Sequence, residues 1–128
     1  MKDFKWLGLD AVLAMHARQL AEHGGGEGVR DKGLLESALQ RPLNKTAYGS
    51  SDVFDLAAAY AYGIARNHPF VDGNKRTALV ASRTFLILNG FQITATQEDR
   101  LTTFLSLASG DLAEDALAAW FRFHANAI

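Results

Sequence analysis

Apolar residues recur at helical spacing along most of this chain. The spacing predicts a first helix over residues 10–23, which ends at three consecutive glycines. Asp31 is a favourable N-cap for a second helix that extends to about Gln40, because Pro42 follows closely and disfavours a helix interior. The polar residues after this proline predict a turn-like connection over residues 44–51.

The next two predicted helices are apolar almost all round. Asp52 is positioned to cap the first of these helices, and the apolar run of this helix covers residues 56–65. Pro69 disfavours the helical conformation at the residue before it, so this helix should stop at about Asn67. The second apolar helix is predicted over residues 74–89. Helices without a polar face belong in the middle of a bundle.

The remainder of the chain predicts a short extended piece and two further helices. Residues 91–94 alternate between apolar and polar positions. Thr96 with Asp99, and Asp111 with Glu114, have the spacing of a cap and its third-position partner at a helix start. The whole pattern predicts an all-α fold, a compact bundle of about six helices.

Composition narrows the classes of protein to consider. With 128 residues, of which 48% are hydrophobic, the chain is expected to form a single domain over residues 1–128 with a core of its own. The formal net charge of −1 gives no general attraction to nucleic acid, so no direct nucleic-acid partner is expected. Cysteine is absent and no apolar stretch reaches the length of a membrane span, so we expect a cytoplasmic location and no membrane partner.

The connection between the two central helices carries the candidate chemistry, and we call it the motif loop. It combines a base, a carboxylate, a glycine turn, an amide and two cations in the order His68-Pro69-Phe70-Val71-Asp72-Gly73-Asn74-Lys75-Arg76. The N–H groups that begin the following helix have no partners within the helix, and the helix dipole makes this end positive. Lys75 and Arg76 add positive charge where acidic residues are normally favoured. The motif loop is therefore typical of a site for an external anion such as phosphate.

Each side chain of the motif loop suits a distinct task. The ordinary pKa of histidine, near 6.5, suits His68 for taking a proton from a hydroxyl. Asp72 is a hard oxygen ligand of the kind that Mg²⁺ binds together with phosphates and water. Phe70 is expected to anchor the loop in the core. Phosphate or nucleotide contacts are expected from Gly73, Asn74, Lys75 and Arg76.

These residues resemble the loop of the Fic/Doc family, which has the form H-x-F-x-D/E-G-N-x-R. The matching positions are His68, Phe70, Asp72, Gly73, Asn74 and Arg76. Most members of that family carry glycine after the asparagine and transfer AMP, whereas the death-on-curing (Doc) toxins carry lysine there, as at Lys75, and transfer the terminal phosphate of ATP. The segment 30–39 and the flanking helices also look Doc-like.

The resemblance implies the toxin component of a toxin-antitoxin system. Its implied reaction transfers the γ-phosphate of ATP, with Mg²⁺, to a hydroxyl of elongation factor Tu and so inhibits translation. The implied catalytic residues are His68, Asp72, Lys75 and Arg76. The implied partner is a Phd-type antitoxin whose disordered segment folds as a helix in a groove near the site. The S/T-x-x-x-E-G/N helix with which many Fic proteins inhibit themselves is absent from this sequence.

In Fic-type proteins the connection ahead of the central helices forms a flap that docks the target. Here the corresponding residues are Lys45, Thr46 and Tyr48, and an ordinary exposed loop is an equal alternative.

Other interpretations stay open at this point. Leu79 stands where the AMP-transferring relatives usually have a second arginine, yet AMP transfer is the main alternative reaction. A catalytically weak module that binds a nucleotide or another anion is the alternative of another class, and a simple helix connection with solvated charges is a third. His16 lies on an apolar stripe and is expected to be a satisfied core histidine rather than a catalytic group. Arg83 shares a face with Arg76 and can either approach the site or pair at the surface.

Overall fold

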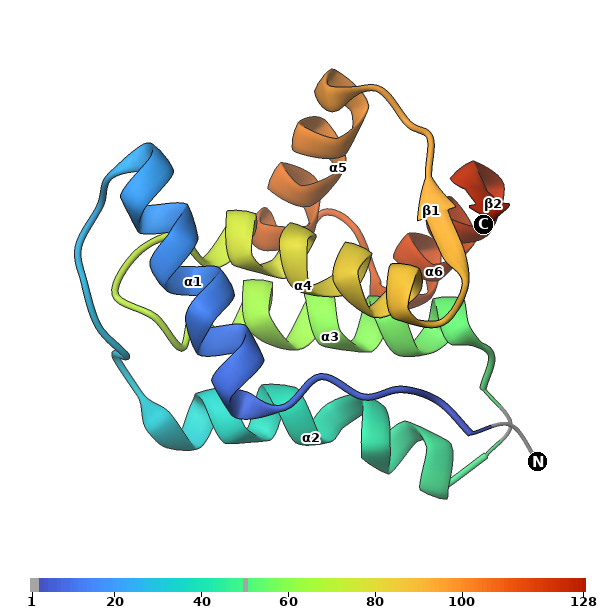
Figure 1. Cartoon of the computed structure of the whole chain (residues 1–128), viewed down its shortest axis with the longest axis horizontal. Coiled ribbons are helices and arrows are strands. Elements are labelled where there is room, and N and C mark those ends of the chain that lie inside the picture. Colours follow the sequence, from blue (N-terminus) through green and yellow to red (C-terminus); the bar gives the residue numbers. More distant parts are fainter. Residues whose placement is uncertain (1–2, 50) are drawn as a thin grey trace.

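The computed structural model describes residues 3–49 and 51–128. Within them the chain is mostly helical, with one small antiparallel sheet, which confirms the all-α bundle of six helices (Figure 1). The elements are α1 (Leu9–His23), α2 (Lys32–Ala47), α3 (Val53–Asn67), α4 (Asn74–Leu88), β1 (Phe91–Ile93), α5 (Gln97–Ser109), α6 (Glu114–His124) and β2 (Ala125–Ala127).

Helix α3 lies at the centre of the bundle, between α2 and α4 (Figure 1). Nearly all of its side chains from Val53 to Ala65 are buried, as its all-round apolar pattern predicts. Small side chains allow close packing, and at Gly63 the approach to α2 is so tight that a Cβ atom would lie 3.0 Å from the Cα and Cβ of Ala38. The motif loop joins α3 to α4, so the prediction that it connects the two central helices is confirmed.

Helix α2 is longer than predicted. It continues through Pro42 to Ala47, so the predicted end at Gln40 is wrong. The predicted turn over residues 44–51 is wrong for residues 44–47, which are helical. A proline in a helix interior removes one hydrogen bond, but the Pro42 ring is buried and α2 packs along α3. Arg41 and Lys45 both bond the Glu114 carboxylate, which ties this half of α2 to α6. Tertiary packing therefore offsets the local penalty.

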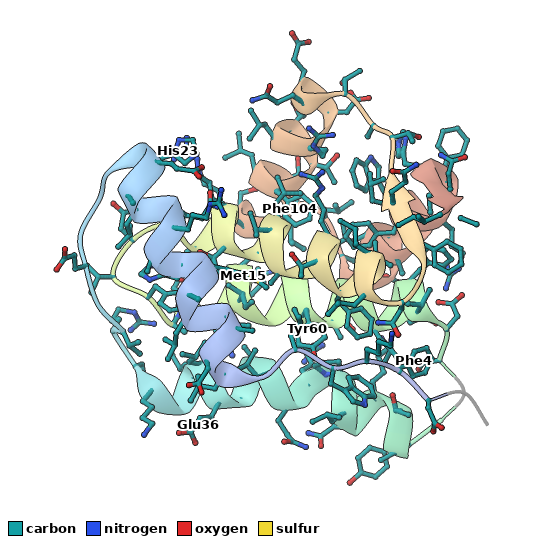
Figure 2. The ribbon with its side chains drawn as sticks, viewed as in Figure 1. Phe4, Met15, His23, Glu36, Tyr60 and Phe104 are labelled. Atoms are coloured by element: carbon teal, nitrogen blue, oxygen red, sulfur yellow. The ribbon has the colours of Figure 1, made fainter. Side chains whose placement is uncertain are left out.

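The segment before α1 completes the core beside α3 and α4. The rings of Phe4 and Trp6 pack against Phe85, and the Tyr60 hydroxyl accepts a hydrogen bond from the Leu7 backbone N–H at 3.0 Å (Figure 2). Burial raises the pKa of Tyr60 above its ordinary value, although the hydrogen bond from Leu7 opposes the shift. Among the described residues no helix is both long and apolar enough to cross a membrane.

The C-terminal third contains two departures from the predicted pattern. The extended piece at residues 91–94 is confirmed as β1, but its partner β2 was not predicted. Thr96 caps α5 as expected, with its side chain accepting from the Asp99 N–H at 3.1 Å. Asp111 does not cap α6, which begins at Glu114. The Asp111 carboxylate instead accepts from the Ser109 hydroxyl at 3.0 Å, a local turn contact that competes with capping.

Candidate active site

His68 stands at the end of α3 in a strained conformation. Its φ of 49° and ψ of 54° are left-handed, and among the described residues it is the one non-glycine residue with a positive φ. Such a conformation costs about 1 to 3 kcal/mol and persists only where surrounding contacts impose it. The helix ends at Asn67, immediately before the His68–Pro69 pair, as the sequence predicts.

Arg30 provides the contacts that hold this helix end. Its Nε donates to the His68 carbonyl at 2.7 Å, and its Nη2 donates to the Asn67 carbonyl at 2.9 Å. These are two of the carbonyl groups that the end of α3 leaves without helical partners. The guanidinium charge also complements the negative end of the helix dipole. Arg30 thus closes α3 with a side chain from another loop.

The loop that carries Arg30, residues 24–31, lies beside the motif loop, and both are at the left of Figure 1. The backbone N–H groups of Arg30 and Asp31 donate to the Pro69 carbonyl, and the Val71 N–H donates to Gly28. Gly25 has a φ of 125°, and a Cβ atom there would lie 2.8 Å from Asp72 Oδ2. The three glycines from Gly24, which predict the end of the first helix, therefore also allow this loop to pack closely against the motif loop.

Inside the motif loop, Phe70 and Asn74 form a buried brace. Phe70 is 1% exposed. The Asn74 side chain accepts from the Phe70 N–H through Oδ1 and donates to the Phe70 carbonyl through Nδ2, both at 3.0 Å. Asn74 is itself buried, so the structure uses its amide chiefly to shape the loop, and only its second amide N–H is left for a phosphate.

His16 supports the other half of the motif loop. Its ring stacks on Phe70 at a centroid distance of 3.7 Å, and its Nε2 lies 2.8 Å from the Asp72 carbonyl. Because a carbonyl accepts, Nε2 must carry the proton. The side chain is buried, which confirms the expected satisfied core histidine. Its contact with the motif loop was not predicted.

The N-terminus of α4 is open to a ligand. Gly73 is its N-cap, with a φ of 79°, and no side chain caps the helix. Its first turn holds no acidic residue, and among the described residues Lys75 and Arg76 make no ion pair within 4.0 Å. Unpaired N–H groups, the positive end of the dipole and two exposed cations therefore coincide.

A groove of about 670 Å³ contains this helix end. One side is polar and cationic, and the other consists of apolar side chains from α4 and α5. Its lining residues are His68, Val71, Asp72, Gly73, Asn74, Lys75, Arg76, Leu79, Leu101, Phe104, Leu105, Ala108 and Ser109. Phe104 is buried at the floor, where Figure 2 shows it between α5 and α4, whereas Leu101 and Leu105 are about half exposed. The structure thus brings the whole chemical end of the motif loop to one groove.

Asp72 is the carboxylate that this groove offers to a metal ion. Its Oδ1 accepts from the Gly73 N–H at 2.8 Å, whereas Oδ2, which lies beside Gly25, has no hydrogen-bond partner among the described residues. Within the part of the chain that the structure describes, no three His, Asp or Glu side chains gather as a metal site. A single carboxylate fits Mg²⁺, which takes one or two of them together with phosphate oxygens and water.

The three residues expected in a target-docking flap lie at the far end of α2 from the motif loop (Figure 1). Lys45 is paired with Glu114 at 2.7 Å, and the Thr46 hydroxyl donates to the Pro42 carbonyl. Tyr48 follows the last helical residue and is 89% exposed. The segment is therefore a helix end and not a turn, and its docking role stays a prediction.

Arg83 does not line the groove, and it makes no ion pair within the described residues. Burial lowers the pKa of its guanidinium, and the nearby charge of Arg100 lowers that pKa further.

Sequence reasoning missed Arg30 and His16 as supports of the site. They contact residues 38 and 56 positions away, and no local pattern encodes such pairs. The Doc-like segment 30–39 was the one available signal, because it begins at Arg30.

Known proteins resemble this chain over most of its length. A model of the Fic/DOC family matches residues 6–86. A protein of Mycolicibacterium smegmatis named Toxin Doc is 45% identical over 101 residues, which are 75% of this chain and 77% of that protein. A protein of Escherichia phage P1 named Protein kinase doc is 32% identical over 114 residues, which are 88% of this chain and 90% of that protein.

A shorter match reaches a larger protein. The Protein adenylyltransferase Fic of Drosophila ananassae is 34% identical over 89 residues, which are 66% of this chain but 18% of that protein. Relatives named for two different transfer reactions are thus similar to this chain.

Proposed function

Because the chain belongs to the Fic/DOC family, we propose that it transfers the γ-phosphate of ATP to a serine or threonine hydroxyl of a target protein. The observation that carries the proposal is the groove in which His68, Asp72 and the open N-terminus of α4 meet. The relative from phage P1, named as a protein kinase, resembles the chain along nearly its whole length. Lys75 supports the same reaction, since by resemblance lysine at this position accompanies phosphate transfer.

The proposed reaction assigns each group a defined step. The target hydroxyl oxygen attacks the γ-phosphorus, the bond from that phosphorus to the bridging oxygen breaks, and ADP leaves with the electron pair. His68 takes the hydroxyl proton. Lys75, Arg76 and the N–H groups at the start of α4 stabilise the charge that develops on the phosphoryl oxygens. When bound through Asp72, Mg²⁺ neutralises phosphate charge.

We further propose that the modified protein is elongation factor Tu and that the consequence is arrested translation. The support is the resemblance to Doc toxins and the relative from M. smegmatis that bears the name Toxin Doc. In this proposal residues 1–128 act as one catalytic domain in the cytoplasm.

Labelled ATP tests the reaction directly. The chain is incubated with purified elongation factor Tu and ATP that carries label on either the γ- or the α-phosphate. We expect the γ-label on the target protein and no α-label. Transfer of the α-label would replace the proposal with AMP transfer, the reaction that the Drosophila relatives' names state.

The alternative of another class is a module that binds a nucleotide without reaction. His68 argues against it, because anion binding needs no base in the groove. If His68→Ala abolishes growth arrest while calorimetry shows unchanged ATP binding, the binding-module alternative fails.

We propose that a Phd-type antitoxin inhibits the chain by folding as a helix on the groove between α4 and α5. Half-exposed Leu101 and Leu105 offer an apolar surface for one helix face, next to the cations of the motif loop. Replacing both leucines by alanine, which adds no charge to the groove, should weaken calorimetric binding of the antitoxin and the relief of growth arrest by its co-expression. Ile87→Ala, on an exposed apolar residue outside the groove lining, is the matched control and should still be relieved. Relief of the double variant would contradict this docking surface.

A further inference from the structure

Two side chains from outside the motif loop contact its backbone, one at His68 and the other at Asp72. Arg30 holds the backbone at His68, and His16 holds the backbone at Asp72. They come from different elements, the loop after α1 and the helix α1 itself, and neither lines the groove. Both therefore act on the site through the motif loop and not by contact with a substrate.

The Arg30 contact is suited to a planar fork. Its Nε and Nη2 reach the carbonyls of two successive residues, His68 and Asn67, at 2.7 and 2.9 Å. A lysine keeps the charge, but its donors share one nitrogen at the end of a flexible chain and lack the rigid fork that matches the two carbonyls in this geometry. Because the Cα–Cβ bond of His68 belongs to the same left-handed backbone, contacts that fix its carbonyl also fix the direction of that bond. Loss of the fork frees both.

The His16 contact combines packing with a directed hydrogen bond. The ring lies parallel to Phe70, with 8° between the planes, and Nε2 donates to the Asp72 carbonyl. The Asp72 carboxylate is fixed separately through the Gly73 N–H. With the backbone and one carboxylate oxygen both held, the direction of the other oxygen is determined. Phenylalanine at position 16 can keep the stacking but not the donor, whereas glutamine can place an N–H near Nε2 but cannot stack as well.

We propose that Arg30 and His16 are positioning residues with separate targets: Arg30 orients the base His68, and His16 orients the Asp72 carboxylate toward the nucleotide and its metal. This inference rests on the proposed function for its kinetic readouts. Its physical claim, that each residue controls one half of the motif loop, has readouts that need no turnover.

Arg30 is tested by comparing Arg30→Lys and Arg30→Ala with Arg18→Ala. Arg18 is a matched control because it is an exposed arginine paired only with Glu22 on the same helix. We expect kcat to fall about 10- to 100-fold in both Arg30 variants, with the KM for ATP little changed, since misplacing a reacting group by about 1 Å is enough for such a loss. The ring signals of His68 in the NMR spectrum should shift in both variants and stay in place in Arg18→Ala.

His16 is tested with His16→Phe and His16→Gln against His23→Gln, an exposed histidine on the same helix. We expect His16→Phe to weaken calorimetric binding of Mg·ATP about 10-fold and to raise the KM, whereas His16→Gln recovers most of the affinity because it restores the donor. The His68 ring signals should be less affected than in the Arg30 variants. A purely structural role predicts the reverse order, with phenylalanine the better replacement.

The outcomes separate this inference from the proposed function. If the wild-type chain transfers AMP or nothing at all, the proposed function fails, while the NMR shifts and the Mg·ATP affinities still decide the inference. If the Arg30 and His16 variants change the His68 signals and the affinity alike, or if neither differs from its control, the division between the two residues is overturned.

Discussion

The two central helices begin in opposite ways. Side chains of the protein cap the N-terminus of α3. Asp52 and Asp55 form a reciprocal capping box, and the Arg122 guanidinium pairs with both carboxylates. The N-terminus of α4 has a glycine at its cap, no side-chain partner and cations in its first turn. Both helices are buried and have the same length, 15 residues. Side chains of the protein therefore stabilise the start of α3, whereas the start of α4 is left free for the ligand that we propose.

The two helix starts should therefore respond differently to substitution. Changes at the start of α4 should reduce activity with little effect on stability, and changes at the start of α3 should do the opposite.

The largest effect is expected at the base that faces the open helix end. His68→Ala should reduce phosphate transfer to the target about 10²- to 10⁴-fold, because the attacking hydroxyl then keeps its proton. The measurement is the initial rate of γ-label incorporation. His23→Ala, an exposed histidine on α1, should keep full activity. A rate for His68→Ala within threefold of the wild type would remove His68 from the mechanism.

Arg76→Ala should lower kcat about 10²- to 10³-fold, the range for loss of one donor to a developing negative charge. Lys32→Ala is the control, because Lys32 is also an exposed cation in a first helical turn but follows an Asp31 cap that is already satisfied. Thermal unfolding should be unchanged for both variants. Equal loss of activity in the two variants would show that general charge, and not the open helix end, is responsible.

Asp52→Ala should lower the free energy of unfolding by about 1 kcal/mol, the usual effect of losing an N-cap, while leaving kcat unchanged. Asp111→Ala is the matched comparison, since Asp111 caps no helix, and should change stability by less than about 0.5 kcal/mol. Urea unfolding measures both. A large loss of activity in Asp52→Ala at intact stability would contradict the contrast between the two helix starts.

The smallest effect is a pH dependence at the α3 end. Partial burial raises the pKa of Asp52, but the hydrogen bonds from Arg122 and from the Asp55 N–H outweigh it and hold the pKa below its ordinary value. The folded state therefore binds a proton less readily than the unfolded state, so Asp52 contributes stability above about pH 4 that is lost as the pH falls further. The stability difference between wild type and Asp52→Asn should shrink on acidification below about pH 4. A difference that is constant with pH would show that the carboxylate charge is not involved.

Local signals in the sequence were sufficient to predict the central part of the fold. Asp52 marks the start of α3, Pro69 marks its end and Gly73 marks the start of α4. Each signal acts within a few residues, through a cap, a restricted backbone or a permitted positive φ, so no knowledge of the tertiary structure is needed. The cationic residues after Gly73 predicted an anion site for the same reason.

The errors fall where distant contacts outweigh local preference. Pro42 predicted a helix end, but packing on α3 and the ion pairs to Glu114 keep α2 helical to Ala47. Strand β2 has three residues with small side chains, too few to show an alternating pattern of apolar and polar positions. It forms because it pairs with β1. Lys45 of the predicted flap lies at this helix end, and its docking role stays a prediction.

The sequence by itself determined that the chain is a helical bundle and that the loop from His68 to Arg76, which holds the candidate catalytic groups, joins its two central helices, because periodicity and turn chemistry are local properties. Only the tertiary structure decided that Arg30 closes α3 over His68, that His16 holds Asp72, and that the Asn74 amide faces Phe70 within the loop. The contacts of Arg30 and His16 join residues far apart in the chain, and the inward turn of the Asn74 amide depends on burial. These contacts follow from the packing of the helices, and the sequence near the motif loop does not encode that packing.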